Sequence, residues 1–123
     1  MYISIDMGAT NTRVASTQDL DQIQKIERFK TGSDLLEQKR LIFESIKKVA
    51  PNNNLDKIVI GVPGRIDSQN HKFVNSPNFP YLNNKHFSEL IDLQNTIVTN
   101  DALLGGLAEA IVGAGAGHKV TAY

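Results

Sequence analysis

The stretch from Lys57 to Val62, which reads Lys-Ile-Val-Ile-Gly-Val, constrains the fold more than any other part of this chain. Its apolar residues do not alternate with polar ones, as they do in a strand with one face in water. An unbroken apolar run of this length is typical of a strand that is buried on both faces of a sheet. The sequence therefore predicts a central strand of an α/β protein at this position.

Three strands joined by hairpins are expected before this run, because β-forming segments alternate there with turn residues. The expected strands cover residues 2–5, 13–17 and 23–31. The turn between the first two consists of the small residues Gly8, Ala9 and Thr10.

A helix is expected to begin at Asp34, which has the spacing of a capping box with Glu37. Its apolar residues are seven, four and three positions apart, which makes one helical stripe. These residues are Leu35, Ile42, Ile46 and Val49. Pro51 and the asparagines that follow it end the helix.

The second half of the chain predicts a long loop and then further strand–helix units. Residues 65–84 are rich in Asn and Pro and are expected to be irregular. A short helix over 87–93 is expected to have Ser88 as its cap. The remaining expected elements are a strand at 97–99, a helix at 102–112, a glycine-rich loop at 113–117 and the start of a strand at 120–123. This order predicts a mixed five-stranded α/β sheet with flanking helices.

The composition excludes several classes of function. The 123 residues include 13 basic and 13 acidic side chains without a long run of one sign, which argues against nucleic acid or an acidic membrane as a partner. No apolar run approaches the roughly 20 residues that span a bilayer, and the N-terminus lacks the features of a signal peptide. With no cysteine and three histidines without ligand spacing, we expect no metal site within this chain. We expect one soluble, cytoplasmic domain.

A turn of small residues follows an acidic residue at the end of the first strand, in the sequence Asp6-Met7-Gly8-Ala9-Thr10. Backbone N–H groups in such a turn can approach an anion closely. The Thr10 hydroxyl can donate to a phosphoryl oxygen, and the Asp6 carboxylate can hold a hydrated Mg²⁺. The pattern is short, so an ordinary hairpin turn is the alternative interpretation.

Two further segments have residue types that suit a ligand site. In residues 61–64, Gly-Val-Pro-Gly, a strand runs directly into a turn that glycine fits best, and a ligand can approach the backbone there. In residues 75–80, Asn-Ser-Pro-Asn-Phe-Pro, the asparagines carry both donors and acceptors, which suits sugar hydroxyls. A simple turn and a polar surface loop are the alternatives.

Asn100 and Asp101 follow the last complete strand. In a sheet built from strand–helix crossovers, ligands bind beyond the carboxyl ends of the strands. At that position Asp101 can accept the proton of a hydroxyl that attacks a phosphoryl group. Asn and Asp are also ordinary helix caps, so a purely structural role is equally consistent with the sequence.

Taken together and in this order, these motifs resemble the N-terminal half of the ROK family (repressors, open reading frames and sugar kinases), within the hexokinase–actin–Hsp70 superfamily. The matching stretches DMGATNTR, GVPGRID, NSPNFP and TNDA lie at residues 6–13, 61–67, 75–80 and 99–102. The resemblance covers essentially the whole chain. It implies the fold of a ribonuclease-H-like, actin-like ATPase domain.

The resemblance also implies a function, that of an ATP-dependent sugar kinase that uses Mg²⁺, with glucose as the default substrate. The first turn would hold the ATP phosphates and Mg²⁺ through Asp6, Gly8, Ala9, Thr10 and Asn11. The sugar would be held by Gly64, Asn78, Asn100 and Asp101. Asp101 would also be the catalytic base for the sugar hydroxyl.

The sequence departs from the family pattern at two positions and in length. Ala9 stands where the family usually has glycine, and Leu103 stands where it often has asparagine. Family members have a second, larger domain, so residues 1–123 are expected to be an N-terminal lobe with negligible kinase activity alone. A homo-oligomer is expected for the full-length protein.

The sugar-binding domain of a ROK-type transcriptional regulator is the alternative function. Such regulators carry a helix-turn-helix before the sugar domain, whereas this sequence starts at its first strand, which favours the kinase. A third alternative is an unrelated α/β binding domain, which would require four motifs to occur in order by chance.

Overall fold

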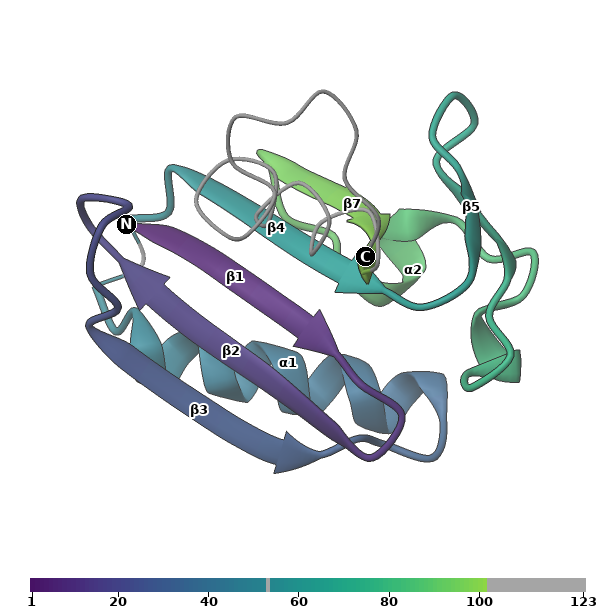
Figure 1. Ribbon diagram of the computed structural model, residues 1–123, viewed down its shortest axis with the longest axis horizontal. Coiled ribbons are helices and arrows are strands. Elements are labelled where there is room, and N and C mark those ends of the chain that lie inside the picture. Colours follow the sequence, from purple (N-terminus) through teal and green to yellow (C-terminus); the bar gives the residue numbers. More distant parts are fainter. Residues whose placement is uncertain (53, 102–123) are drawn as a thin grey trace, which may run out of the picture.

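A five-stranded mixed sheet is the centre of the molecule (Figure 1), as the sequence predicts. The computed structural model describes residues 1–52 and 54–101. The spatial order of the strands is β3-β2-β1-β4-β7. These strands are β1 (Tyr2–Met7), β2 (Asn11–Thr17), β3 (Lys25–Lys30), β4 (Lys57–Val62) and β7 (Thr96–Asn100). The predictions for 102–112, 113–117 and 120–123 lie outside the described residues.

Strand β1 joins the antiparallel half of the sheet to the parallel half. It pairs antiparallel with β2, and β2 pairs antiparallel with β3. On its other side β1 pairs parallel with β4, which pairs parallel with β7. In the register, Asp6 is aligned with Gly61, and Gly61 is aligned with Thr99. The carboxyl ends of β1, β4 and β7 therefore lie at one edge of the sheet.

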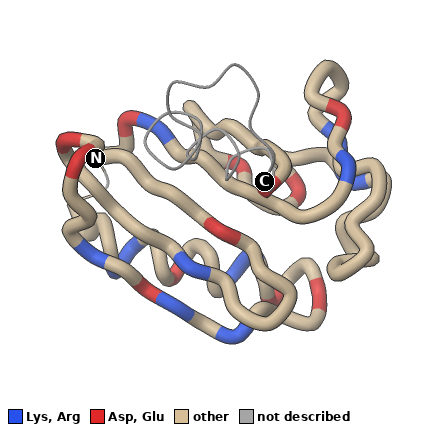
Figure 2. Tube along the Cα trace, in the orientation of Figure 1, with Lys and Arg blue, Asp and Glu red and all other residues tan. Residues whose placement is uncertain are grey.

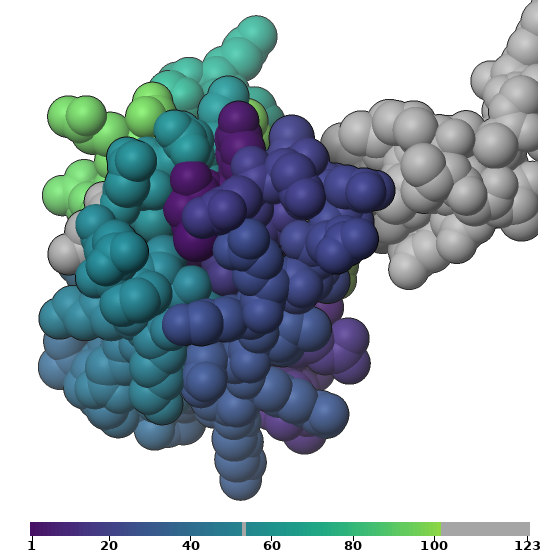
Figure 3. Space-filling view, turned by 90° about the vertical axis from the view of Figure 1, so that its left-hand side faces the viewer, coloured from purple at the N-terminus to yellow at the C-terminus, as the bar shows by residue number. Residues whose placement is uncertain are grey.

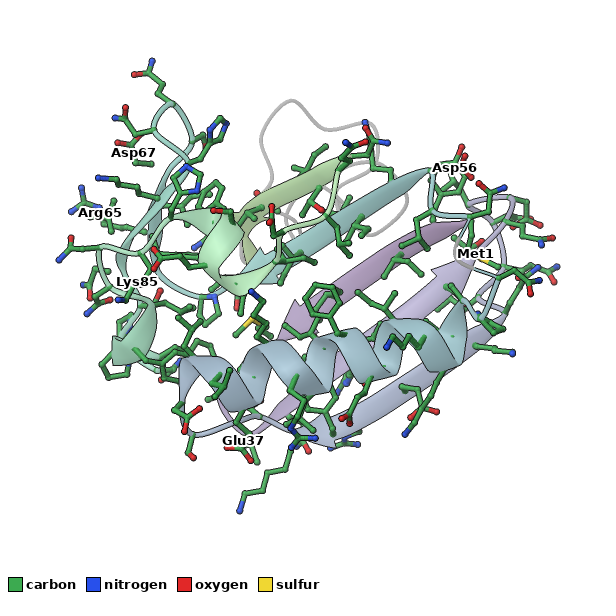
Figure 4. All side chains as sticks on the ribbon, turned by 180° about the vertical axis from the view of Figure 1, so that it is seen from behind. Met1, Glu37, Asp56, Arg65, Asp67 and Lys85 are labelled. Atoms are coloured by element: carbon green, nitrogen blue, oxygen red, sulfur yellow. The ribbon has the colours of Figure 1, made fainter. Side chains whose placement is uncertain are left out.

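Helix α1 (Leu35–Val49) covers one face of the sheet (Figure 4). The Asp34 side chain caps it by accepting from the Glu37 N–H at 2.8 Å. The Glu37 carboxylate accepts from the N–H and hydroxyl of Ser33, at 2.9 and 3.0 Å, so the reciprocal bond of the expected capping box is shifted by one residue. The predicted apolar stripe faces the sheet, with Ile42, Ile46 and Val49 buried.

The core lies between α1 and the strands that it covers. Along β1 the side chains alternate, with Ile3, Ile5 and Met7 buried and Ser4 and Asp6 exposed. In β4, the side chains of Ile58, Ile60 and Val62 are fully buried on the face of α1. On the other face Gly61 is buried but Val59 is only half-buried. Within the part of the chain that the structure describes, β4 is therefore fully buried on one face and partly buried on the other.

The predicted irregular stretch of residues 65–84 contains a hairpin, which corrects the sequence analysis. β5 (Arg65–Asp67) and β6 (Lys72–Asn75) pair antiparallel, and a 3₁₀ helix, η1 (Pro80–Leu82), follows them. Strands of three and four residues are too short for alternation to identify them. Phe73 of β6 is fully buried and anchors the hairpin to the core.

Helix α2 (Phe87–Leu90) is shorter than predicted and has a different cap. The Nδ1 atom of His86 accepts from the Ser88 N–H at 3.3 Å, and the Glu89 carboxylate accepts from the His86 N–H at 2.8 Å. His86, rather than Ser88, is therefore the N-cap. The chain becomes extended at Ile91, which ends the helix there. Among the described residues, no helix is long and apolar enough to cross a membrane.

Strand β3 forms one edge of the sheet and is rich in charge (Figure 2). Its six residues include Lys25, Glu27, Arg28 and Lys30. Lys48 of α1 pairs with Glu27 at 3.5 Å. The strand is shorter than the predicted 23–31, because residues 23, 24 and 31 lie outside it.

The N-terminus lies at the end of the sheet away from the carboxyl ends of the parallel strands (Figure 1). There the start of the chain, purple in Figure 3, lies between the turn that joins β2 to β3 and the segment that joins α1 to β4. The amino group of Met1 forms an ion pair with Asp56. Figure 4 shows this pair at the end of the sheet opposite Arg65 and Asp67. The candidate site is therefore separated from the N-terminus by the length of the sheet.

Candidate functional site

Three segments leave the sheet at the carboxyl ends of the parallel strands (Figure 1). β1 leads into the turn of residues 8–10, β4 leads into Pro63 and Gly64, and β7 ends at Asn100. Val62 is aligned with Asn100 in the register. The parallel pairing therefore brings the predicted phosphate turn, the glycine-proline turn and the Asn-Asp pair to one edge of the sheet, where ligands bind in α/β proteins.

The turn of residues 8–10 is a tight hairpin. The Gly8 N–H donates to the Asn11 carbonyl at 3.0 Å, and the Thr31 N–H donates to the Thr10 carbonyl at 2.9 Å. A Cβ on Gly8 would lie 2.7 Å from the Asn11 oxygen, a contact that real side chains do not make. Ala9 and Thr10 are exposed, so the turn presents its backbone and a hydroxyl group to solvent. These groups suit a phosphate.

Asp6 and Asn11 flank this turn. Asp6 is exposed near the end of β1 and is the register partner of Arg13 on β2. Asn11 is half-buried and begins β2. The exposed carboxylate of Asp6 fits the chemistry of a hydrated Mg²⁺. Among the described residues, no group of three or more His, Asp or Glu side chains is arranged to hold a metal ion.

Gly64 links two of the three segments. Its φ of 102° lies in the region that glycine adopts without strain. A Cβ at this position would lie only 2.1 Å from the Asn75 carbonyl oxygen, so the turn packs directly on the end of β6. The Nδ2 atom of Asn100 donates to the Gly64 carbonyl. Gly64 is therefore in contact with both Asn75 and Asn100.

The loop of residues 75–80 is held by hydrogen bonds and by one buried side chain. The Ser76 N–H donates to Oδ1 of Asn83 at 2.8 Å, and the Phe79 N–H donates to the Ser76 carbonyl at 3.0 Å. The Phe79 side chain is buried, which holds the loop on the core. Asn78 is exposed at the surface of this loop. Its predicted role as a sugar ligand stays a prediction.

Asp101 directly follows β7 and is half-buried. Its position beyond the carboxyl end of a parallel strand is the one expected for a residue that contacts a ligand. Its role as a base stays a prediction, as do the ligand roles of Asn100 and of the first turn.

Tyr81 follows the loop of residues 75–80 and was not identified from the sequence. Its hydroxyl donates to the Gly32 carbonyl at 3.2 Å, which joins η1 to the residues that precede α1. Burial, followed by the negative charges of Asp34 and Glu37, raises the pKa of Tyr81 to about 12. The hydroxyl therefore keeps its proton, and this hydrogen bond, at neutral pH.

Gln38 is a second residue that the sequence analysis missed. Its side chain is fully buried, and it bonds to Thr12 and Gly32. The helical spacing contains a signal for it, because Gln38 lies three residues after Leu35 and four before Ile42. A polar residue in the middle of an apolar stripe indicates a buried hydrogen-bonding role.

Comparisons with known proteins agree with this fold. The model of the ROK family matches residues 2–123. No curated protein matches the chain. Among solved structures, a ROK family glucokinase from Streptomyces griseus, in complex with glucose and AMPPNP, is 20% identical with a TM-score of 0.80. An inorganic polyphosphate/ATP-glucomannokinase from Arthrobacter sp. strain KM is 22% identical with a TM-score of 0.80.

A regulator is also similar. A ROK family transcriptional regulator, described as a homolog of the E. coli MLC protein, is 18% identical with a TM-score of 0.74. The alignment with the glucokinase covers 95% of this chain but only 38% of the glucokinase. For the glucomannokinase these shares are 96% and 51%, and for the regulator they are 90% and 30%. At these identities, the similarity to solved structures establishes the fold.

Proposed function

The chain belongs to the ROK family, and from this premise we propose that it is the N-terminal lobe of an ATP-dependent sugar kinase. Residues 1–123 are this lobe, and a second lobe completes the enzyme. The share of the similar glucokinase that the chain spans, 38%, supports this division. A kinase of this family closes two lobes around its substrates, so the first lobe alone has negligible activity. The enzyme is cytoplasmic and uses ATP.

One observation carries the proposal. The phosphate turn and the contact between Asn100 and Gly64 lie at the same edge of the sheet. A phosphoryl donor and a hydroxyl acceptor must approach each other in line. A shared edge for the two groups of residues supports transfer of a phosphoryl group between their ligands.

The proposed roles follow from the chemistry of each residue. The first turn binds the phosphates through Gly8, Ala9, Thr10 and Asn11, and Mg²⁺, held with the help of Asp6, supplies positive charge at the phosphates when it is bound. Gly64, Asn78 and Asn100 bind the sugar, a hexose or N-acetylhexosamine with glucose as the default.

Asp101 accepts the proton of the attacking hydroxyl. The sugar oxygen forms a bond to the γ-phosphorus while the bond from that phosphorus to the bridging oxygen of ADP breaks. The proton moves from the sugar hydroxyl to the Asp101 carboxylate, and the products are a sugar phosphate and ADP. A carboxylate suffices as base, because phosphoryl transfer proceeds through a loose transition state and the proton can leave late.

The test is turnover by the full-length protein. ADP release is measured with ATP, Mg²⁺ and a panel of hexoses and N-acetylhexosamines, for the wild type, Asp101→Asn and Asp21→Asn. The control replaces an exposed aspartate in the turn region between β2 and β3, away from the site. We expect turnover with one sugar, a loss of several orders of magnitude in Asp101→Asn and no loss in Asp21→Asn.

A sugar sensor is the second candidate, since a regulator of the same family has the same fold. Binding of a sugar without ADP release by the wild-type protein would favour this function over the kinase. Turnover that Asp101→Asn retains would instead remove Asp101 from the mechanism while keeping the kinase.

A further inference from the structure

Gln38 is a polar residue at a fully buried position of α1. Both ends of its amide are bonded: Oε1 accepts from the Gly32 N–H at 2.8 Å, and Nε2 donates to the Thr12 hydroxyl oxygen at 3.0 Å. Burying an amide costs free energy unless hydrogen bonds compensate, and an apolar side chain would meet a requirement for packing alone. We therefore attribute the amide at this position to its hydrogen bonds with Gly32 and Thr12.

The hydrogen bonds from Gln38 through Thr12 and Thr31 to Gly8 all have the same donor-to-acceptor direction. The Thr31 hydroxyl donates to the Gly8 carbonyl at 2.8 Å. A hydroxyl has one hydrogen to donate, so in its contact with Thr12, at 3.0 Å, Thr31 must be the acceptor. The Thr12 hydroxyl therefore donates to Thr31 and accepts from Gln38. An uninterrupted series of hydrogen bonds leads from the amide of Gln38 to the carbonyl of Gly8.

The direction of the Gly8 carbonyl fixes the direction of the next N–H. In a trans peptide the C=O of one residue and the N–H of the following residue point in opposite directions. The peptide between Gly8 and Ala9 is trans. Because its carbonyl is held toward Thr31, its N–H points away from Thr31, on the solvent-exposed turn. Among the described residues, no acceptor binds the N–H of Ala9.

We propose that Gln38, Thr12 and Thr31 are positioning residues, which hold the N–H of Ala9 in the direction required to donate to a phosphate group of the nucleotide. Donors that are oriented before the ligand arrives do not have to be ordered on binding, so they increase affinity. The inference rests on the proposed function, because it assumes that the turn receives the phosphates of ATP.

Removal of the last hydroxyl of the series tests the inference. Thr31→Val keeps the shape of the side chain and removes the donor to the Gly8 carbonyl, whereas Thr31→Ser keeps that donor. Thr96→Val is the matched control, because the Thr96 hydroxyl also donates to a backbone carbonyl, that of Leu93, at 2.8 Å, and lies at the opposite end of the sheet. The three variants are made in the full-length protein.

The kinetic readout separates a positioning role from a general loss of structure. We expect Thr31→Val to raise the KM for MgATP by about tenfold, the effect of one hydrogen bond, while the KM for the sugar changes by less than about twofold. Thr31→Ser restores the KM for MgATP, and Thr96→Val leaves both constants unchanged. Equal increases in both KM values in Thr31→Val, or no increase in either, would overturn the inference.

A second readout stays informative if the wild-type protein does not turn over, in which case the proposed function itself fails. The amide resonance of Ala9 is followed by NMR in protein labelled with ¹⁵N-alanine, without nucleotide. A shifted Ala9 resonance in Thr31→Val, with the wild-type position retained in Thr31→Ser and Thr96→Val, supports the positioning of this N–H. An Ala9 resonance that is the same in all four proteins would overturn it.

Discussion

Replacement of Gly64 by alanine is expected to be among the most destabilising single-methyl additions in this chain. Two separate costs arise. With a φ of 102°, an L-residue is strained by about 1–2 kcal/mol. The new Cβ would also lie 2.1 Å from the Asn75 carbonyl oxygen, and real Cβ atoms stay at least 3.0 Å away, so this backbone must move by 0.9 Å, the difference between the two distances. Overpacking of this kind costs about 1–3 kcal/mol.

The expected loss is therefore about 2–5 kcal/mol of the free energy of unfolding, the sum of the two costs. Urea denaturation followed by circular dichroism measures it. The control is Asn95→Ala, at another position with positive φ, 60°, where the side chain is exposed. This variant has the backbone cost without the close contact. We expect its free energy of unfolding to fall by about 1 kcal/mol.

The contact between Gly64 and Asn75 also predicts a functional effect. A displaced Gly64 carbonyl loses its bond from Asn100, so sugar affinity should fall in the same variant. If Gly64→Ala loses no more stability than Asn95→Ala, the end of β6 yields to the new methyl group and the argument from close packing is wrong.

Three further predictions concern the residues around α1. Asp34→Ala should lower the free energy of unfolding by about 1 kcal/mol, because the Glu37 N–H loses its acceptor, and Asp34→Ser should recover most of the loss in urea denaturation. Gln38→Leu should lower the free energy of unfolding by about 2 kcal/mol, because the Gly32 N–H is left buried without its acceptor. An unchanged urea midpoint would mean that water replaces the amide. The pKa of Tyr81 is raised from 10.0 to about 12. The stability that its protonated hydroxyl contributes is therefore complete below pH 10 and is lost as the pH rises through 12. Absorbance at 295 nm should show a tyrosine that ionises near pH 12 and is missing in Tyr81→Phe, and complete ionisation by pH 10.5 would contradict the assigned burial.

The architecture could be predicted because its signals are local or strongly periodic. The apolar run of β4, the small turn after β1 and the spacing of Leu35, Ile42 and Ile46 identified the central strand, the first hairpin and α1. The mixed character of the sheet followed as well, because strands connected through a helix run in the same direction. The spatial order of the strands was not predicted.

The parts that were missed depend on contacts between distant residues. The hairpin of β5 and β6 has too few residues for a period, and Phe73 is buried by the tertiary fold rather than by a local pattern. The cap of α2 is an exception, because His86 bonds to Ser88 and Glu89 close by in the sequence, whereas Ser88 was the expected cap. Tyr81 meets Gly32 across 49 positions of sequence, a contact that no local pattern contains.

The two edges of the sheet differ in the side chains that they offer to another strand. At the edge formed by β3, four of six residues are charged, and charged edge strands resist pairing with a second chain. Among the described residues the other edge is β7, Thr-Ile-Val-Thr-Asn, which carries no charge and has Ile97 46% exposed. Strand addition, whether by a further segment of the protein or by aggregation, is therefore directed to β7. Substitutions intended to improve solubility belong on β7, where a lysine at the exposed position of Ile97 would give this edge the protection that β3 already has.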